Sequence, residues 1–232
     1  MTKEVIGFAQ LPVDVPGWGD ILSMLDGAWQ PHFNTNDYKG NWEVLSLRSP
    51  GGSDSNIFAD AYGHQHYADT KYMQQLPQIK TLIDRLQCPV KSVRLLNLRA
   101  GAVIKPHRDH ELAFEHGEAR LHFPIITNDK VAFHVQDKVV PMLPGQCWYI
   151  NANLPHSVAN NGTTDRIHLV VDCRVNEWLT AIFAKAFKVF FKQQADDVQA
   201  RHIIAALRVQ DTATTRALAD QMESELGQTS DG

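Results

Sequence analysis

The sequence predicts a mainly β protein, an antiparallel barrel or double-sheet jelly roll, that continues into a helical C-terminal extension. Short apolar segments follow one another between residues 90 and 173, with turn signals and no helical spacing between them. After Asn176 the spacing of apolar residues becomes helical. We therefore expect a jelly-roll domain over residues 1–176. The helical extension over residues 177–232 would pack on the core or form a homodimer contact.

Composition fits a single large globular domain. The 232 residues are 44% hydrophobic, and the net charge of −4 gives no basic surface for nucleic acid. Cys88, Cys147 and Cys173 show no CxxC spacing, which argues against a disulfide framework and a cysteine zinc site. There is no signal-peptide pattern at the N-terminus and no apolar run of the roughly 18–20 residues that a membrane helix needs. The expectation is a cytoplasmic protein with neither nucleic-acid nor membrane partners.

The first 70 residues contain fewer signals. An apolar run predicts a strand near Val5–Leu11, which Pro12 ends, and Gly19–Ala28 has a weak helical pattern. Asn41–Arg48 has the composition of a strand and stops before Pro50. Residues 51–70 are rich in Gly, Ser, Asp, Asn and His without periodicity, which predicts a long loop that is a candidate substrate lid.

The remaining elements follow from periodicity. Pro77–Leu86 has the i, i+3, i+4, i+7 spacing of a helix with proline at its start. The strands expected next are Val90–Arg99, Val103–Asp109, Ala119–Thr127, Val131–Gln136, Lys138–Leu143, Gln146–Asn151 and Arg166–Cys173. Apolar residues from Trp178 to Phe191 predict a long amphipathic helix, and Leu207 and Leu218 suggest one or two more.

His107 and Asp109 are the first candidates for chemistry. Residues two apart lie on one face of a strand, so both side chains can reach the same metal ion. His156 follows downstream, and two histidines with one carboxylate are the ligand set of non-haem Fe(II) oxygenases. Since the chain has 11 histidines, a chance HxD in an exposed loop is the alternative. That alternative leaves unexplained the charged and polar residues at otherwise apolar strands: His107, Arg120, His122, His156 and Arg166.

Arg166 begins the last predicted strand and is the natural partner for a carboxylate, because its planar guanidinium binds both oxygens. Arg120 and His122 share one strand face, and so do Arg166 and His168. If those faces point inward, a positive pocket that suits a dicarboxylate lies beside the metal. The alternative for His122 and His168 is a structural role in the core.

Five sequence words resemble one known family in the same order. They are GAVIKPHRD (101–109), ARLHFP (119–124), PGQCWY (144–149), LPHSVA (154–159) and DRIHLVVD (165–172). Over about residues 90–178 the chain thus resembles the aspartyl/asparaginyl β-hydroxylase family of 2-oxoglutarate-dependent Fe(II) dioxygenases. The resemblance implies a double-stranded β-helix core and an enzyme that uses Fe(II), 2-oxoglutarate and O₂ and releases succinate and CO₂.

The resemblance also implies roles for individual residues. His107, Asp109 and His156 would be the iron ligands, and Arg166 would bind the distal carboxylate of 2-oxoglutarate. Arg120 and His122 would lie near the metal-chelating end of 2-oxoglutarate or near the substrate, with His168 in the same pocket.

Three functions remain open at this point. The first is β-hydroxylation of Asp or Asn in a protein, a peptide or the free amino acid. The second is cis-hydroxylation of free L-proline, because bacterial proline cis-4-hydroxylases resemble the same family. The third is a non-catalytic jelly-roll module that binds a metal or ligand. Candidates for a substrate carboxylate are Arg48, Arg94, Arg108 and Arg174, each of which is alternatively an ordinary surface arginine.

Overall fold

The structure is a computed structural model that describes residues 3–19, 21, 29–33, 35–56, 66–109, 112–193, 197–210 and 212–228. The chain divides into two compact units. One comprises residues 7–189, and the other comprises the two chain ends, before residue 7 and after residue 189. No helix among the described residues has the length and apolar character needed to cross a membrane.

Strands dominate the larger unit. The strands are β1 (Lys3–Leu11), β2 (Gln30–Pro31), β3 (Tyr38–Lys39), β4 (Trp42–Pro50), β5 (Tyr67–Asp69), β6 (Val90–Leu98), β7 (Val103–His107), β8 (Glu118–Ile126), β9 (Val131–Val135), β10 (Lys138–Val139), β11 (Cys147–Ile150), β12 (His156–Asn160), β13 (Arg166–Arg174) and β14 (Phe187–Gln193). The α-helices are α1 (Pro77–Arg85), α2 (Glu177–Ala184), α3 (Asp197–Gln210) and α4 (Ala213–Gln228).

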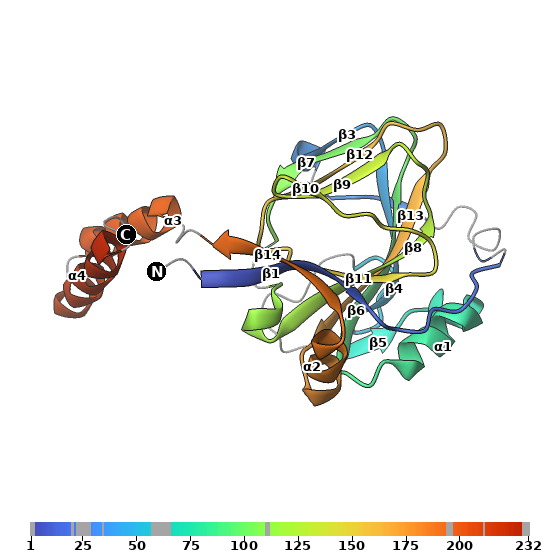
Figure 1. The fold of residues 1–232 in the computed structure, drawn as a ribbon, viewed down its shortest axis with the longest axis horizontal. Coiled ribbons are helices and arrows are strands. Elements are labelled where there is room, and N and C mark those ends of the chain that lie inside the picture. The colour runs from blue at the N-terminus through green and yellow to red at the C-terminus, as the bar shows by residue number, and fades with distance from the viewer. Residues whose placement is uncertain are drawn as a thin grey trace. The chain divides into compact units, whose positions relative to one another are not determined.

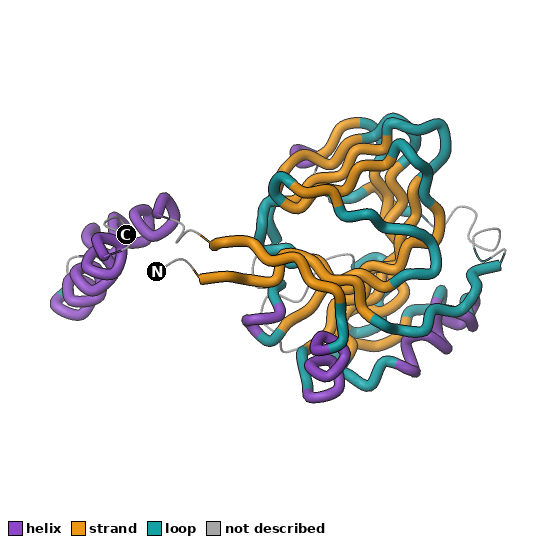
Figure 2. Tube along the Cα trace, in the orientation of Figure 1, coloured by secondary structure: helices purple, strands orange, loops and turns teal. Residues whose placement is uncertain are grey.

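The strands form two sheets that face each other, as Figures 1 and 2 show. The larger sheet has the order β14-β1-β11-β8-β13-β6-β4-β2, with β5 beside β4, and the smaller has the order β10-β9-β12-β7-β3. The registered pairs are antiparallel, for example β13 with β6 and with β8. This arrangement confirms the predicted mainly β fold with a jelly-roll core.

Strand alternation sorts the side chains of the larger sheet into two faces. In β8, Arg120 and His122 face the smaller sheet and line a cavity, whereas the intervening Leu121 is buried on the other face. Helices α1 and α2 cover that outer face (Figure 1). Phe183 of α2 packs there with a ring-centroid distance of 4.9 Å from Tyr149 of β11. The sheet is therefore buried on both sides, and polar residues on its inner face need partners inside the cavity.

The unit at the chain ends contains the helices α3 and α4. Arg208 of α3 donates to Asp220 at 2.5 Å and to Glu223 at 3.0 Å on α4. Ile204 and Ala219 are buried. These two helices confirm the prediction made from Leu207 and Leu218.

Most predicted elements between residues 77 and 173 are confirmed to within two residues. The expected strand Lys138–Leu143 is an exception, because β10 ends at Val139, before Pro141. Strand β12 is an element that the sequence pattern missed. The loop expected over residues 51–70 ends too late, because Tyr67–Asp69 form a strand. Residues 57–65 of that loop lie outside the described residues. Most of the expected helix Gly19–Ala28 lies outside the described residues.

The long helix expected from Trp178 to Phe191 is wrong after residue 184. Helix α2 ends at Ala184, and the phenylalanines that extend its pattern lie on strand β14. Phe187 and Phe190 are 63% and 48% exposed, while Phe191 is buried. The domain boundary at residue 176 and a dimer contact through the C-terminal segment stay predictions.

Candidate metal and cosubstrate site

Two facing histidines and one carboxylate converge inside the larger unit. His107 ends β7, His156 begins β12, and the two residues pair directly across the strands. Asp109 lies just beyond β7, where its N–H donates to the Ala152 carbonyl at 2.8 Å. One possible ligand atom from each of the three side chains lies within 4.8 Å of the others. In the described part of the chain, this is the one such group of three or more His, Cys, Asp or Glu side chains.

Backbone carbonyls orient both imidazoles. Nδ1 of His107 donates to the Lys105 carbonyl at 2.8 Å, and Nδ1 of His156 donates to the Leu154 carbonyl at 3.0 Å. These bonds favour the tautomer in which Nε2 carries the free lone pair, which is how metal-binding histidines are usually held. Nε2 of His107 lies 4.0 Å from Oδ1 of Asp109. The donor set therefore fits Fe(II), for which two imidazoles and a carboxylate leave open coordination positions.

Arg120 connects Asp109 to a second buried carboxylate. Its Nη1 donates to Asp109, while its Nε donates to Oδ1 of Asp172 at 2.7 Å. Asp172 also accepts from Arg94 at 2.6 Å and from Ser92 at 2.8 Å. Burial alone would raise the pKa of Asp172, but Arg120 and Arg94 outweigh it and hold that pKa far below its usual value. This ion cluster holds Asp109 as a charged carboxylate in a fixed position.

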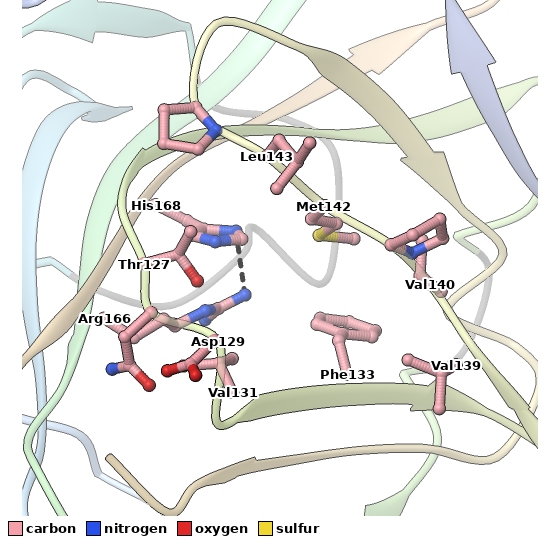
Figure 3. Close-up of a pocket in the computed structure, with 13 residues that line it drawn as sticks. Thr127, Asp129, Val131, Phe133, Val139, Val140, Met142, Leu143, Arg166 and His168 are labelled. Carbon is pink, nitrogen blue, oxygen red and sulfur yellow. Dashed lines mark hydrogen bonds between the residues drawn. The ribbon is translucent and has the colours of Figure 1, made fainter.

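Arg166 lies at the other side of the site and is 1% exposed. Its Nη2 donates to Nδ1 of His168 at 2.8 Å, the dashed line in Figure 3. The guanidinium lies 5.6 Å from the centre of the Phe133 ring. Among the described residues no carboxylate pairs with Arg166, and burial lowers its pKa to about 9. Nε of Arg166, Nε2 of His168 and Nδ1 of His122 are buried without hydrogen-bond partners in the described structure. Such orphaned donors indicate a place for an anionic ligand.

Two cavities meet at Arg166 and Phe133. The inner cavity has a volume of about 40 Å³ and is lined by Trp42, Leu96, Ile104, His107, Asp109, Arg120, His122, Phe133, Ile150, Ala152, His156, Val158 and Arg166. The outer cavity, drawn in Figure 3, has a volume of about 460 Å³ and is lined by residues 127–129, 131, 133, 139–144, 166 and 168. Arg166 can thus contact a molecule that extends from the triad toward the outer cavity.

Burial keeps four histidines in and around the site neutral, namely His32, His122, His156 and His168. It lowers the pKa of His156 to about 4, and burial together with Arg166 places the pKa values of His122 and His168 well below 6.5. Burial and the charge of Arg94 lower the pKa of His32 to about 4. Neutral imidazoles have a lone pair available for a metal or a hydrogen-bond donor, so the site is ready for ligands at neutral pH.

We expect the metal-free protein to lose stability as the pH falls from about 6.5 to about 4. In this window the unfolded chain takes up protons on histidines that the folded protein keeps neutral, so protonation favours unfolding. Melting temperatures at pH 7 and pH 5 with a chelator present would measure the effect. Because the pKa of Asp172 is held far below 5, its ion pairs do not contribute to this difference. Equal melting temperatures would contradict the prediction.

The structure brings seven predicted site residues together and separates the substrate candidates from them. Arg48 pairs with Asp69 at 2.6 Å on β5. Arg108 donates to the Asn153 carbonyl at 3.3 Å near the surface. Arg94 is closest to the site through Asp172, although it does not line the inner cavity. Arg174 is largely exposed.

Sequence reasoning missed an aromatic wall. The rings of His32 and Trp42 stack with centroids 3.5 Å apart and planes 13° apart, and Tyr38 packs edge-on against Trp42 at 5.8 Å. Trp42 lines the inner cavity, and the charges of Asp109 and Arg94 both act on His32. No spacing in the sequence indicated this wall, because it joins the residue after β2 with the first residues of β3 and β4.

Comparisons with known proteins find relatives of this chain. An L-proline cis-4-hydroxylase from Rhizobium meliloti (strain 1021) is 31% identical over 135 residues, which cover 57% of this chain and 48% of the relative. An L-proline cis-3-hydroxylase from a Streptomyces species is 31% identical over 142 residues, which cover 57% of this chain and 47% of the relative. The chain thus spans about half the length of the curated relatives it matches.

A solved prolyl-4-hydroxylase from Pseudomonas putida aligns over 73% of this chain and 94% of its own, with a TM-score of 0.44 and 13% identity, a likeness too slight to argue from. The family model described as aspartyl/asparaginyl β-hydroxylase matches residues 20–175, well over half of the chain. The predicted resemblance is confirmed, and the chain belongs to the aspartyl/asparaginyl β-hydroxylase family.

Proposed function

We propose that this protein is an Fe(II)- and 2-oxoglutarate-dependent dioxygenase that hydroxylates a small substrate bearing a carboxylate. The observation that carries the proposal is the convergence of His107, Asp109 and His156 in a buried cavity beside Arg166, a buried cation with no carboxylate partner in the described structure. A structural role explains the triad poorly, because both imidazoles are held with Nε2 free to face the cavity.

In this proposal different residues bind the metal and the cosubstrate. His107, Asp109 and His156 would hold Fe(II), and Arg166 would bind the distal carboxylate of 2-oxoglutarate. His168 and His122, both neutral and buried, offer further hydrogen bonds beside it. Bound Fe(II) with 2-oxoglutarate and O₂ supplies the oxidising power to hydroxylate an unactivated C–H, with release of succinate and CO₂. The protein contributes orientation and a cavity that excludes water.

Arg120 acts as a positioning residue in this proposal. Three of its nitrogen atoms, Nε, Nη1 and Nη2, donate to Asp109 and Asp172, so it holds the metal-binding carboxylate rather than 2-oxoglutarate. The family resemblance implies that Arg120 lies near the metal-chelating end of 2-oxoglutarate or near the substrate. Because three of its nitrogens already donate to Asp109 and Asp172, we favour the orienting role.

A count of charges favours a substrate with a carboxylate. Arg94, Arg120, Asp109 and Asp172 cancel one another, so bound Fe(II) and Arg166 would bring three uncompensated positive charges. The 2-oxoglutarate dianion would leave one, which would attract the carboxylate end of a zwitterionic amino acid.

Free L-proline is the substrate we favour, and Asp or Asn β-hydroxylation is the second candidate. The relatives reported above are proline hydroxylases, whereas the description of the family model supports Asp or Asn. The stacked His32–Trp42 pair offers an apolar wall against which the ring of proline could pack. This ordering reverses the one suggested by the sequence words alone.

A direct assay tests the proposal. The protein would be incubated with Fe(II), 2-oxoglutarate and O₂, and succinate would be measured without substrate and with L-proline, L-aspartate, L-asparagine or a peptide containing both acidic and amide residues. We expect L-proline to stimulate succinate release and to gain one oxygen atom by mass. Stimulation by aspartate or asparagine instead would support the second candidate. The absence of succinate under every condition, with Fe(II) bound, would overturn the enzymatic proposal in favour of a binding module.

A further inference from the structure

The proposed function leaves the outer cavity of Figure 3 unused. Its volume of about 460 Å³ falls within the range of about 300–1,000 Å³ that is typical of small-molecule sites. It shares Phe133 and Arg166 with the inner cavity, whereas His168 lines the outer cavity and not the inner one. The triad residues line the inner cavity and not the outer one. The outer cavity is therefore a separate compartment that reaches the buried Arg166.

Most of the wall of the outer cavity is apolar. Every residue of the segment 139–144, at the end of β10 and after it, lines the cavity, and so do Val131 and Phe133 of β9. Leu143 is 58% exposed, which places it where the cavity opens to solvent. A ligand that fills the cavity therefore needs an apolar part.

Hydrogen bonds hold this apolar wall in place without a ligand. The N–H of Val140 donates to the Phe133 carbonyl at 2.8 Å. The N–H of Leu143 donates to Oε1 of Gln146 at 3.0 Å, and the same oxygen accepts from Nε1 of Trp148 at 2.8 Å. The cavity is therefore preformed, so that a ligand does not have to order the segment when it binds.

Two buried polar groups lie at the base of the cavity. Arg166 and His168 are each 1% exposed, and Figure 3 shows their side chains pointing toward each other beside the apolar residues. Nδ1 of His168 accepts from Arg166, so the neutral imidazole carries its proton on Nε2. Nε2 of His168 and Nε of Arg166 have no hydrogen-bond partner in the described structure. A cation and a neighbouring N–H donor that lack an acceptor are suited to a carboxylate.

We propose that the outer cavity is a binding site for a short-chain hydrocarbon monocarboxylate, whose carboxylate contacts Arg166 and His168 and whose chain packs along the apolar wall. Among the described residues that line the cavity, Arg166 is the one cation. The exposed carboxylate of Asp129, which also lines the cavity, disfavours a second negative charge on the ligand. The charge and the apolar wall both distinguish this ligand from 2-oxoglutarate, which has two carboxylates.

The ligand of the outer cavity would compete with 2-oxoglutarate, because one guanidinium would serve both. This consequence rests on the proposed function, since it requires Arg166 to bind the cosubstrate from the inner cavity. The site itself does not depend on the proposed function, because the triad residues do not line the outer cavity.

Calorimetric titration of the metal-free full chain tests the site. The probes are octanoate, acetate, which has the charge without the chain, and octan-1-ol, which has the chain without the charge. We expect octanoate to bind at least about 10-fold more tightly than either of the other two. Each methylene between butanoate and octanoate should tighten binding by roughly 3- to 4-fold. Arg166→Met should weaken octanoate binding by about 10-fold or more, because hydrogen bonds to a charged group are lost.

Leu143→Asp and Phe187→Asp are a matched pair of variants. Leu143 and Phe187 are exposed apolar side chains, at 58% and 63%, and of the two Leu143 lines the cavity. We expect Leu143→Asp to weaken octanoate binding, because a charge replaces an apolar contact with the chain. Phe187→Asp should bind octanoate as the wild type does.

Equal affinity for octanoate and octan-1-ol, or for octanoate and acetate, would overturn the proposal. So would wild-type octanoate affinity in Arg166→Met or in Leu143→Asp. In the Fe(II)-loaded protein, octanoate should raise the apparent dissociation constant of 2-oxoglutarate. If octanoate binds without this effect, the competition is wrong, and with it the assignment of Arg166 to the cosubstrate. If octanoate does not bind while succinate is formed, this inference falls and the proposed function stands.

Discussion

Replacing His156 with alanine should weaken Fe(II) binding by more than about 100-fold. If His156 is one of three iron ligands, as we propose, its loss should cost more than the 10–100-fold typical of removing a residue that merely orients a ligand. His156 is 8% exposed, and its ring lies 4.2 Å from that of His107. Anaerobic titration with Fe(II) and 2-oxoglutarate, followed by the weak visible charge-transfer band, would measure the loss.

His134→Ala is the matched control. His134 lies on β9, where it pairs with Ser157, the residue next to His156, but it does not line the inner cavity. Wild-type Fe(II) affinity in His134→Ala with loss in His156→Ala would support the assignment. Equal affinity in both variants would show that His156 is not a ligand. Circular dichroism of the metal-free variants would confirm that each retains the fold.

The core strands were predictable because their sequence carries the signal locally. Strands β8 and β13 are each nine residues long and more than half apolar, as expected for strands that are buried on both faces. Strand β12 lacks this signal: it is five residues long, follows Pro155, and gains its stability from pairing with β7 on one side and β9 on the other. A strand that is stabilised mainly by pairing with its neighbours need not show a strand pattern in its own sequence.

For strand β14 the sequence pattern predicted the wrong element, a helix in place of a strand. Phe187, Phe190 and Phe191 continue the i, i+3, i+4 spacing of α2, and a single-sequence pattern cannot see the neighbouring strand that β14 joins in the sheet. Pairing within the sheet overrides the helical spacing.

The sequence predicted those site residues whose type is unusual for a strand. It did not predict the contacts that depend on which residues pair across neighbouring strands. Polar side chains at apolar strands are costly to bury unless they have a partner. This makes four residues conspicuous in the sequence: His107, Asp109, His156 and Arg166. The role of Asp172 depends on its lying opposite Arg120 in β8 and next to Arg94 in β6, which only the paired strands establish. A signal was present, however: a carboxylate inside a fully buried strand must have a cationic partner.

The last prediction concerns Arg120 and Arg166, two buried arginines for which the same substitution should have opposite effects on stability. Arg120→Met leaves Asp109 and Asp172 without their main partner, so the free energy of unfolding should fall by about 3–5 kcal/mol. Arg166→Met removes a buried charge that no described carboxylate compensates, so the free energy of unfolding of the ligand-free protein should stay equal or rise, by up to about 4 kcal/mol. The cost of the hydrogen bond lost to His168 is smaller, about 1 kcal/mol.

The affinity for 2-oxoglutarate should also distinguish Arg166 from Arg120. Arg166→Met should weaken 2-oxoglutarate binding by at least about 30-fold, equivalent to about 2 kcal/mol, because the distal carboxylate loses its charged partner. Urea unfolding of the metal-free proteins and titration of 2-oxoglutarate into the Fe(II)-loaded proteins would measure both effects. If Arg166→Met is at least as stable as the wild type but binds 2-oxoglutarate more weakly, then Arg166 serves to bind the cosubstrate and does not stabilise the fold. Strong destabilisation with unchanged affinity would instead make Arg166 a structural residue and remove the cosubstrate from the position we assign to it.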